Sequence, residues 1–150
     1  MTDIARRASA PWHLWLVGVL SLLWSGFGAY DYIQTNMRGA AYMREAGFGD
    51  DMIAYYNAMP AWMYAPWTIG VWGAVIGSLL LLARSRWAVH AFVLSLIGAA
   101  VSLIYSKFVN PPPPLPAEMA MMEWMPYVIT LIAAFLAWYA WTMAKKGVLR

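Results

Sequence analysis

Apolar residues form four long blocks along the chain, separated by shorter polar segments. The blocks cover about residues 11–32, 62–83, 87–108 and 124–144. Each is about as long as the 17–25 apolar residues that cross a bilayer core. A soluble helical bundle would show a charged face on every helix. That face is missing, because no Asp, Glu, Lys or Arg occurs in residues 17–30, 69–83, 91–105 or 128–144. The pattern predicts an all-α fold, an integral membrane four-helix bundle that forms a single domain over residues 1–150.

The segment between the first two blocks is predicted to contain a short helix in GDDMIAYYNAMPAW. Asp50 can cap this helix, and Asp51 suits the positive end of the helix dipole. We expect the helix to lie at the outer membrane surface. The stretch NPPPPLP, before the fourth block, is expected to be extended and to cross the outer ends of the helices, because proline cannot donate backbone hydrogen bonds.

Small residues recur inside the blocks at steps of three and four. They are Gly18, Ser21, Ser25 and Gly28; Gly70, Gly73 and Gly77; Ala91, Ser95, Gly98 and Ser102; and Thr130, Ala133, Ala137, Ala140 and Ala144. This spacing is typical of the contact seam in left-handed helix packing. Small residues let membrane helices approach closely. The pattern predicts a compact antiparallel bundle with little room for a central pore.

Charged residues are scarce and unevenly placed. Only 11% of the chain is charged and 63% is hydrophobic, whereas a soluble domain carries roughly a quarter charged residues. The basic residues expected on one side of the membrane are Arg6, Arg7, Arg84, Arg86, Lys145, Lys146 and Arg150, against Arg38, Arg44 and Lys107 on the other. By the positive-inside rule the first side is cytoplasmic, so both termini are expected inside. The net charge of +3 does not indicate a nucleic-acid partner.

Histidine and methionine are the candidate metal ligands. His13 and His90 are predicted near the same end of their helices, where two neutral imidazoles could bind haem iron or another metal. The alternative is two interfacial histidines near water. Methionine gathers on the opposite side, and EMAMMEWM includes Met119 and Met122. Thioethers bind Cu(I), but they also fill irregular apolar gaps.

Asp31 is the most prominent carboxylate, because it stands where the first apolar block stops. About 30 Å of helix separates it from Pro11 at 1.5 Å per residue, so it is expected at the outer boundary of the membrane. There it either ends the helix or helps to bind a ligand. The candidate ligand-binding residues are Asp31, Tyr30, Tyr32, Gln34, Trp67 and Trp124.

Catalytic motifs are absent from the sequence. It contains no cysteine, no HExxH, no glycine-rich phosphate loop and no paired carboxylates inside a block. The serines in the blocks are better explained by helix packing than by nucleophilic catalysis. We therefore expect a protein that is not an enzyme and that carries no cofactor.

Two stretches of the sequence carry a resemblance to a known group. They are WHLWLVGVLSLLWSGFGAYDY and PAWMYAPWTIGVWGAVIGSLLLLARSRWAV. The chain resembles a bacterial family of small four-helix inner-membrane proteins, some of which are labelled sugar transporter. The resemblance implies a multi-pass protein of the inner membrane, but it brings no catalytic or binding residues. At Ser25 the family pattern has Asn, so a polar group that faces the bundle is smaller in this chain.

Three functions follow from these observations. The first is a non-catalytic membrane protein, either an accessory subunit of a larger membrane complex or a bundle that forms a homo-oligomer in the bilayer. The second is a transporter of a small neutral solute such as a sugar. The third is the handling of Cu(I) at the outer face. The residues expected to pack the helices together are Gly18, Ser25, Gly73, Gly77, Ser95, Gly98, Ala133 and Ala137.

Overall fold

The computed structural model describes residues 9–150, and these contain helices and no strands. In chain order the helices are α1 (Trp12–Arg38), α2 (Ala40–Glu45), α3 (Asp50–Asn57), η1 (Ala61–Met63), α4 (Tyr64–Leu82), α5 (Trp87–Ile104), η2 (Tyr105–Val109), η3 (Ala117–Trp124) and α6 (Met125–Lys145). Four of the helical segments are long and apolar enough to cross a membrane, which is typical of a multi-pass membrane protein. Arg6 and Arg7 lie outside the described residues.

The first helix continues past the boundary that its apolar block predicts. α1 ends at Arg38, where Gly39 takes a φ of 56° and donates its N–H to the carbonyl of Thr35. Asp31 therefore lies inside the helix, and the expectation that it ends the helix is wrong. Polar residues 34–38 can stay helical because nothing before Gly39 breaks the hydrogen-bond ladder.

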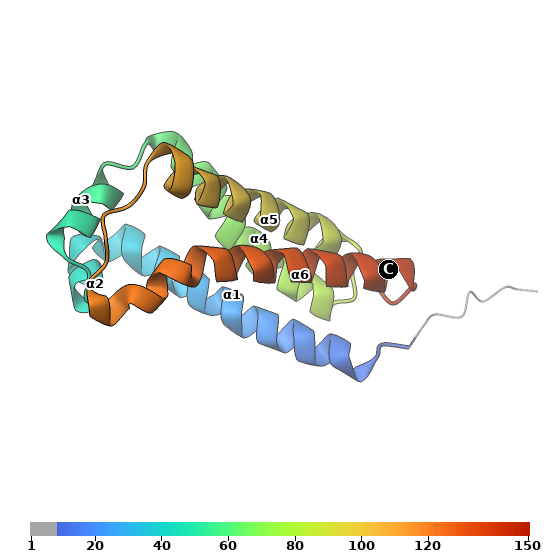
Figure 1. Cartoon of the computed structure of the whole chain (residues 1–150). Helices are drawn as coiled ribbons and strands as arrows, with labels where there is room; N and C mark the ends of the chain where they lie inside the picture. Colours follow the sequence, from blue (N-terminus) through green and yellow to red (C-terminus); the bar gives the residue numbers. More distant parts are fainter. Residues whose placement is uncertain (1–8) are drawn as a thin grey trace, which may run out of the picture.

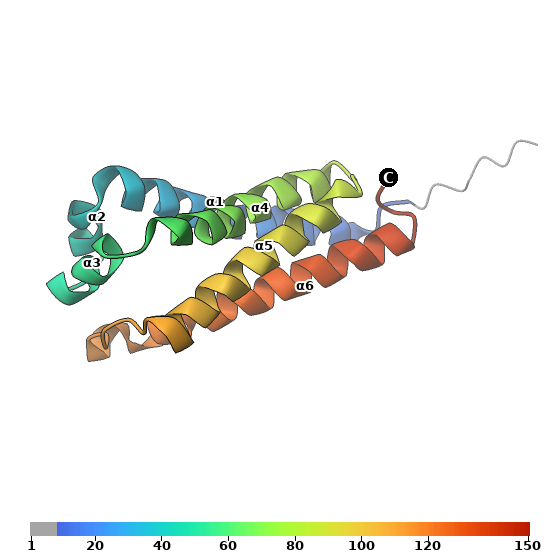
Figure 2. The ribbon, with the colours of Figure 1, turned by 90° about the horizontal axis from the view of Figure 1, so that it is seen from above.

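The long helices pack in a fixed order, with α1 along α4, α4 along α5, and α5 along α6. In Figure 1 the start of α1 and the C-terminus lie at one end, which we call the tail end. Helices α2 and α3 lie at the other end, the cap end. Figure 2 shows the α1/α4 pair and the α5/α6 pair diverging toward the cap end.

Helices α4 and α5 make the tightest contact. A Cβ added at Gly98 would lie 2.7 Å from the backbone nitrogen of Gly70 and closer still to the carbonyl oxygen of Pro66. A Cβ at Gly73 would lie 3.2 Å from the Cβ of Ser95. The Ser95 hydroxyl donates to the carbonyl of Gly70 at 2.7 Å. Glycine is needed at these crossings because any side chain would push the two backbones apart.

Other small residues occupy different places. Gly18 and Gly77 lie against the side chains of Leu82 and Phe92. Ser25, Ala133 and Ala137 are buried. Gly28, by contrast, has nothing within 4 Å of its Cβ direction. The buried position in that turn of α1 is Ala29, at 7% exposure.

The main apolar core lies in the tail half. Its buried members are Leu14, Leu81, Ala88, Phe92, Leu136, Ala137, Tyr139, Ala140, Met143, Val148 and Leu149. They come from all four long helices and from the chain after α6. Burial of Val148 and Leu149 is a feature that the sequence pattern does not predict, because the apolar block ends before them.

The last residues of the chain pair with the turn between α4 and α5. The Arg150 amide donates to the Arg84 carbonyl, and the Arg86 amide donates to the Arg150 carbonyl, both at 2.7 Å. Arg84 also donates from Nε to the carbonyl of Val148 at 3.1 Å. These bonds hold the C-terminal residues across the tail end of the bundle.

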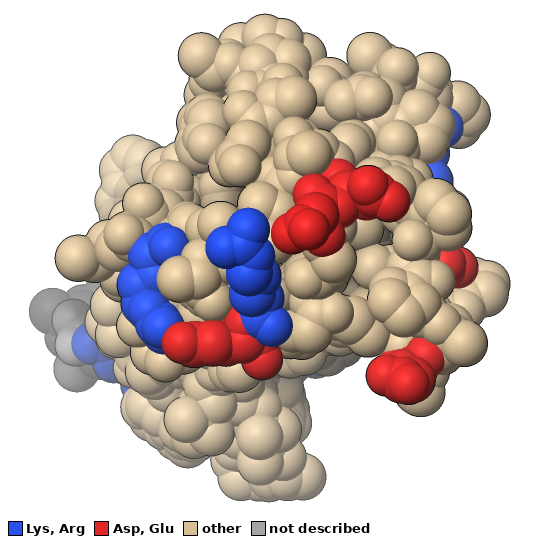
Figure 3. Space-filling view, turned by 90° about the vertical axis from the view of Figure 1, so that its left-hand side faces the viewer, with Lys and Arg blue, Asp and Glu red and all other residues tan. Residues whose placement is uncertain are grey.

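The cap end is built from short elements. Met43, Met52 and Ile53 form a small apolar cluster, against which Leu115 of the proline-rich stretch packs. The Tyr55 hydroxyl donates to the carbonyl of Asn110 at 2.7 Å. The short helix α3 begins at Asp50, and no side chain caps its first turn. Figure 3 shows acidic side chains gathered on this end, with basic ones among them.

Candidate functional site

Asp31 binds a residue of the cap rather than its neighbours on α1. It accepts a hydrogen bond of 2.7 Å from the hydroxyl of Tyr42. Asp31 is exposed and Tyr42 is half-buried. This bond joins α2 back onto α1 across the turn at Gly39. One role of the carboxylate is therefore to hold the cap against the end of α1.

Tyr32 points in a different direction, because successive residues of a helix are separated by about 100°. Its hydroxyl lies 2.6 Å from Oγ1 of Thr68 on α4. Its ring makes edge contacts with Trp67 at 4.7 Å and Trp72 at 6.1 Å. These four residues form an aromatic cluster, which we call the Tyr32 cluster, between α1 and α4.

The remaining predicted ligand-binding residues do not join the Tyr32 cluster. Tyr30 is 54% exposed. Gln34 is half-buried. Trp124 is 68% exposed and its ring lies 5.9 Å from that of Tyr127, on the α6 side of the molecule. The predicted site is therefore divided into an Asp31–Tyr42 bond, the Tyr32 cluster and a separate aromatic pair where η3 meets α6.

Phenols at the cap end stay protonated over a wide pH range. The hydrogen bond to Asp31, followed by burial and the negative charge of that carboxylate, raises the pKa of Tyr42 to about 12. Burial, followed by the charge of Asp31, raises the pKa of Tyr56. Burial also raises the pKa of Tyr55. At neutral pH these side chains are hydrogen-bond donors and not general bases.

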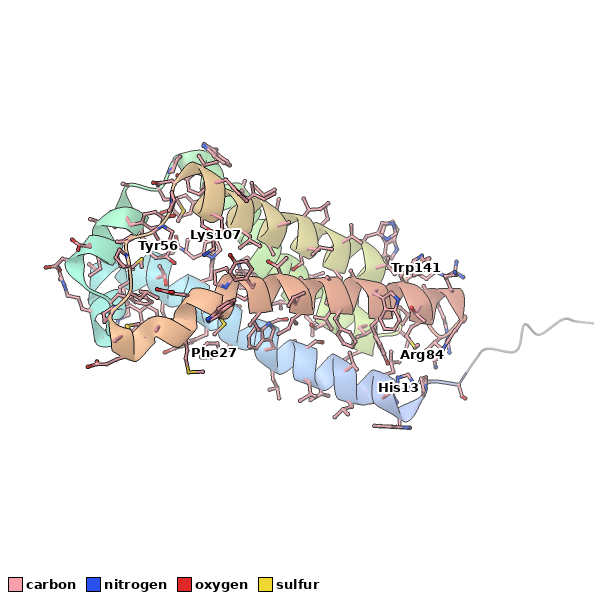
Figure 4. The ribbon with its side chains drawn as sticks, in the orientation of Figure 1. His13, Phe27, Tyr56, Arg84, Lys107 and Trp141 are labelled. Carbon is pink, nitrogen blue, oxygen red and sulfur yellow. The ribbon has the colours of Figure 1, made fainter. Side chains whose placement is uncertain are left out.

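The two histidines have different partners. His13 Nδ1 lies 2.5 Å from the hydroxyl of Tyr139 and so joins α1 to α6 at the tail end. Figure 4 shows His13 at this end of the molecule. His90 is exposed, and its ring lies 4.9 Å from that of Trp87. Within residues 9–150, no three His, Cys, Asp or Glu side chains are grouped closely enough to hold a metal ion.

The methionines are dispersed over separate environments. Met43, Met52 and Met63 are buried in apolar surroundings. Met119 lies against Gly47. Met121 and Met122 are 87% and 39% exposed. The EMAMMEW segment lies in the 3-10 helix η3, so Met119 and Met122, three residues apart, share one face and Met121 lies on another.

Hydroxyl groups within the bundle bind helix backbones or one another. Ser21 donates to the Gly18 carbonyl, Ser78 to the Ala74 carbonyl and Thr130 to the Pro126 carbonyl. Ser25 and Ser78 lie 3.5 Å apart. Among the described residues every buried polar side-chain atom has a partner. These hydroxyls consequently serve helix packing in the present conformation.

Sequence reasoning missed Tyr42, Thr68, Trp72 and Tyr139 as partners of the residues it selected. Thr68 and Trp72 could have been found, because they fall one and five residues after Trp67 on a predicted helix. Tyr42 and Tyr139 could not, since neither lies beside a candidate ligand-binding or metal-binding residue in the sequence. Lys107 is a further case, because its Nζ lies 5.0 Å from the centre of the Tyr127 ring, and Figure 4 shows it directed toward α6.

Comparison of the chain with protein-family models, with curated proteins and with solved structures finds no match to any of them.

Proposed function

We propose that this protein is a non-catalytic subunit of a membrane assembly, and that another transmembrane helix binds between α1 and α6 in the cap half. In this proposal the bundle is antiparallel and sits in a bacterial inner membrane. The tail end faces the cytoplasm with both termini, as the positive-inside rule favours. The cap end, with α3 at the membrane surface, faces outward.

One face of α6 carries the proposal. Met143, Leu136 and Ile129 follow one another at seven-residue intervals, so they lie on the same face of the helix. Met143 and Leu136 are each 3% exposed, whereas Ile129 is 42% exposed. The face is thus buried within the bundle in the tail half and left without a helix partner in the cap half.

The neighbouring helix supports the same interpretation. At the tail end α1 reaches α6 through the His13–Tyr139 hydrogen bond. Farther along α1, Trp24 is 37% exposed and Phe27 is 68% exposed. Both helices therefore expose large apolar side chains beyond the place where the hydrogen bond joins them. A partner helix inserted there would gain van der Waals contacts, which drive helix association in lipid.

Site-directed photo-crosslinking in native membranes tests the proposal. A benzoylphenylalanine at Ile129, on the face of α6 without a helix partner, is expected to capture one protein of defined mass that mass spectrometry can identify. The matched control is Leu131, which lies at the same depth on α6, is 69% exposed and points about 200° away. An adduct of twice the subunit mass would identify a homo-oligomer, and another mass a different subunit.

Equal capture at Ile129 and Leu131, or capture of lipid alone at Ile129, would contradict the proposal. The subunit should also be purified at its native expression level, since overexpression produces more copies of it than its partner can bind. A strictly monomeric protein under those conditions would count against both forms of the assembly.

A transporter of a small neutral solute is the second candidate, and the Tyr32 cluster favours it. Aromatic faces and the Tyr32 and Thr68 hydroxyls could bind a sugar ring near the cap end. The core of the tail half, with Phe92 and Leu81 at 0% exposure, would then have to open. Uptake of labelled glucose into reconstituted vesicles, abolished by Trp67→Leu and retained by Trp124→Leu, would support transport. Vesicles that take up no glucose above the protein-free rate would argue against it.

A further inference from the structure

Basic side chains gather at the tail end, where the proposed subunit function leaves them without a role. They are Arg84, Arg86, Lys145, Lys146 and Arg150. Within residues 9–150 every Asp and Glu falls between Asp31 and Glu123, on α1 near the cap, on the cap elements or on η3. The described acidic side chains are therefore remote from this group, which favours a positive potential over the tail end.

The C-terminal residues convert part of this group into an ordered cluster. Arg150 exchanges both of its backbone hydrogen bonds with the α4–α5 turn, one with Arg84 and one with Arg86. Its position is fixed because Val148 and Leu149, 4% and 1% exposed, are anchored in the apolar core. Arg150, which is far from Arg84 and Arg86 in the sequence, thus leaves the backbone beside them on one surface.

The α4–α5 turn contains one arginine in an unfavourable backbone conformation. Arg84 has a φ of 58°, a region that favours glycine. Its Nε donates to the carbonyl of Val148, which orients the guanidinium over the C-terminal residues. Glycine would fit the turn with less strain, but it would supply neither this bond nor a charge.

Aromatic rings place the cluster at headgroup depth. Trp87 and Trp141 are 66% and 50% exposed at the tail ends of α5 and α6. Lys145 Nζ lies 4.2 Å from the centre of the Trp141 ring. Indole rings at helix ends prefer the membrane interface. The arginine cluster therefore faces the phosphates of a lipid leaflet, and Figure 4 shows Arg84 and Trp141 at this end.

We propose that Arg86 and Arg150, held side by side by the turn at Arg84, form a binding site for the phosphate headgroup of an anionic phospholipid, with Lys145 and Lys146 adding to the attraction. Guanidinium groups match phosphate oxygens in pairs of hydrogen bonds. Basic clusters at helix ends are suited to anionic headgroups. The C-terminal residues act as the element that assembles the site, since they bring Arg150 beside the turn.

Lipid titration followed by native mass spectrometry tests the site on the intact, detergent-solubilised protein. The probes are phosphatidylglycerol and phosphatidylcholine with identical acyl chains. The parent protein is expected to bind phosphatidylglycerol at least tenfold more tightly. The double variant Arg86→Gln/Arg150→Gln is expected to lose most of that preference, because each basic residue near a membrane surface contributes to the attraction of an anionic lipid.

The double variant Arg38→Gln/Arg44→Gln is the matched control. It removes the same charge from the cap end, where these arginines pair with Glu45 and Asp50. It is expected to keep the preference of the parent. An equal loss in both double variants would show that net charge alone attracts the lipid, and would overturn the site.

A third variant separates an assembled site from a diffuse charge. Leu149→Ala keeps every arginine but removes the anchor of the C-terminal residues, so it is expected to weaken phosphatidylglycerol binding below the unfolding temperature. Unchanged binding would overturn the role of these residues. Binding of a polyglutamate peptide that matches the lipid in affinity and needs the same arginines would instead assign the surface to an acidic protein segment.

Discussion

The two halves of the bundle differ in how their helices are held together. In the tail half, Leu136 and Met143 of α6 are each 3% exposed and Leu14 of α1 is fully buried. In the cap half, Ile129 on the same face of α6 is 42% exposed. In the tail half α6 packs into the common apolar core, whereas in the cap half α6 leaves that core and the close packing is that of α4 with α5 and of α1 with α4. The comparison teaches that all four long helices share one apolar core in the tail half, whereas α6 leaves that core in the cap half.

Close backbone contact between helices is the second feature of this comparison. Lipid removes much of the hydrophobic incentive for helices to associate, so close van der Waals contact has to replace it. Such contact is found where α4 and α5 cross at Gly70 and Gly98. That crossing lies toward the cap end, where the polar connections include the Tyr42–Asp31 bond, the Tyr55–Asn110 bond and the Lys107–Tyr127 contact. Each of these can be broken without opening a cavity.

The largest effect is expected from Gly98→Val. The added side chain would meet the backbone of Gly70 and Pro66, which cannot move aside, so α4 and α5 must separate. We expect a loss of about 3 kcal/mol or more in the free energy of unfolding, measured by denaturation in mixed micelles. Gly28→Ala is the control and should stay close to the parent, because nothing lies within 4 Å of its Cβ direction. Similar losses in both would mean that the α4–α5 crossing is not the tight contact.

Leu149→Ala should follow, with a loss of about 2–4 kcal/mol, because truncation of a buried leucine leaves a cavity. The measurement is the same unfolding titration, combined with hydrogen exchange at the Arg150 and Arg86 amides, which should become faster. Leu131→Ala removes the same atoms from a side chain that is 69% exposed, and it should cost much less. If the two leucine variants were equally stable, the C-terminal residues would not belong to the core.

Tyr139→Phe should destabilise the protein by about 1 kcal/mol, since it removes one hydrogen bond and leaves the aromatic packing in place. The bond between Tyr139 and His13 is the polar connection between α1 and α6 at the tail end. A double-mutant cycle with His13→Phe should show coupling between the two positions. Additive losses would indicate that the bond does not form in the membrane. Distance measurements by spin labels on α1 and α6 would show whether the tail half opens.

Tyr42→Phe should have the smallest effect at neutral pH, about 1 kcal/mol or less, because the bond to Asp31 lies at the exposed cap. Its pKa of about 12 lies above the unfolded value of 10. The stabilisation is therefore complete below pH 10 and is lost as the pH rises through 12. Ultraviolet titration should show one phenol that ionises late in the parent and is missing in the variant. A parent and a variant with the same stability profile from pH 9 to 12 would contradict the bond.

Several features of the fold are predictable from the sequence. The four apolar blocks correspond to helices long enough to cross a membrane, because block length and the absence of charge are local properties. The short helix at Asp50 follows from its own spacing of residues. The end of α1 is mispredicted, since helix formation depends on backbone hydrogen bonds and continues past the last apolar residue to Gly39.

The candidate site is predictable only in part. The sequence predicts Tyr32 and Trp67 as ligand-binding residues at one membrane boundary, and their rings are in contact. Asp31 was grouped with them because it is adjacent in sequence, yet it points elsewhere and binds Tyr42. The direction of a side chain on a helix is regular, but its partner depends on which helix lies beside it. The sequence does not give the order in which the helices pack, so it does not identify that neighbour.

The sequence by itself determined the number of long apolar helices, their small-residue faces and the division of charge between the two ends. All of these are periodic or compositional properties of single segments. Only the tertiary structure decided that Gly98 lies against Gly70, that His13 of α1 meets Tyr139 of α6, and that Arg150 lies beside Arg84 and Arg86. The physical reason is that such contacts join residues far apart in the chain, and their geometry is set when all the helices pack at once.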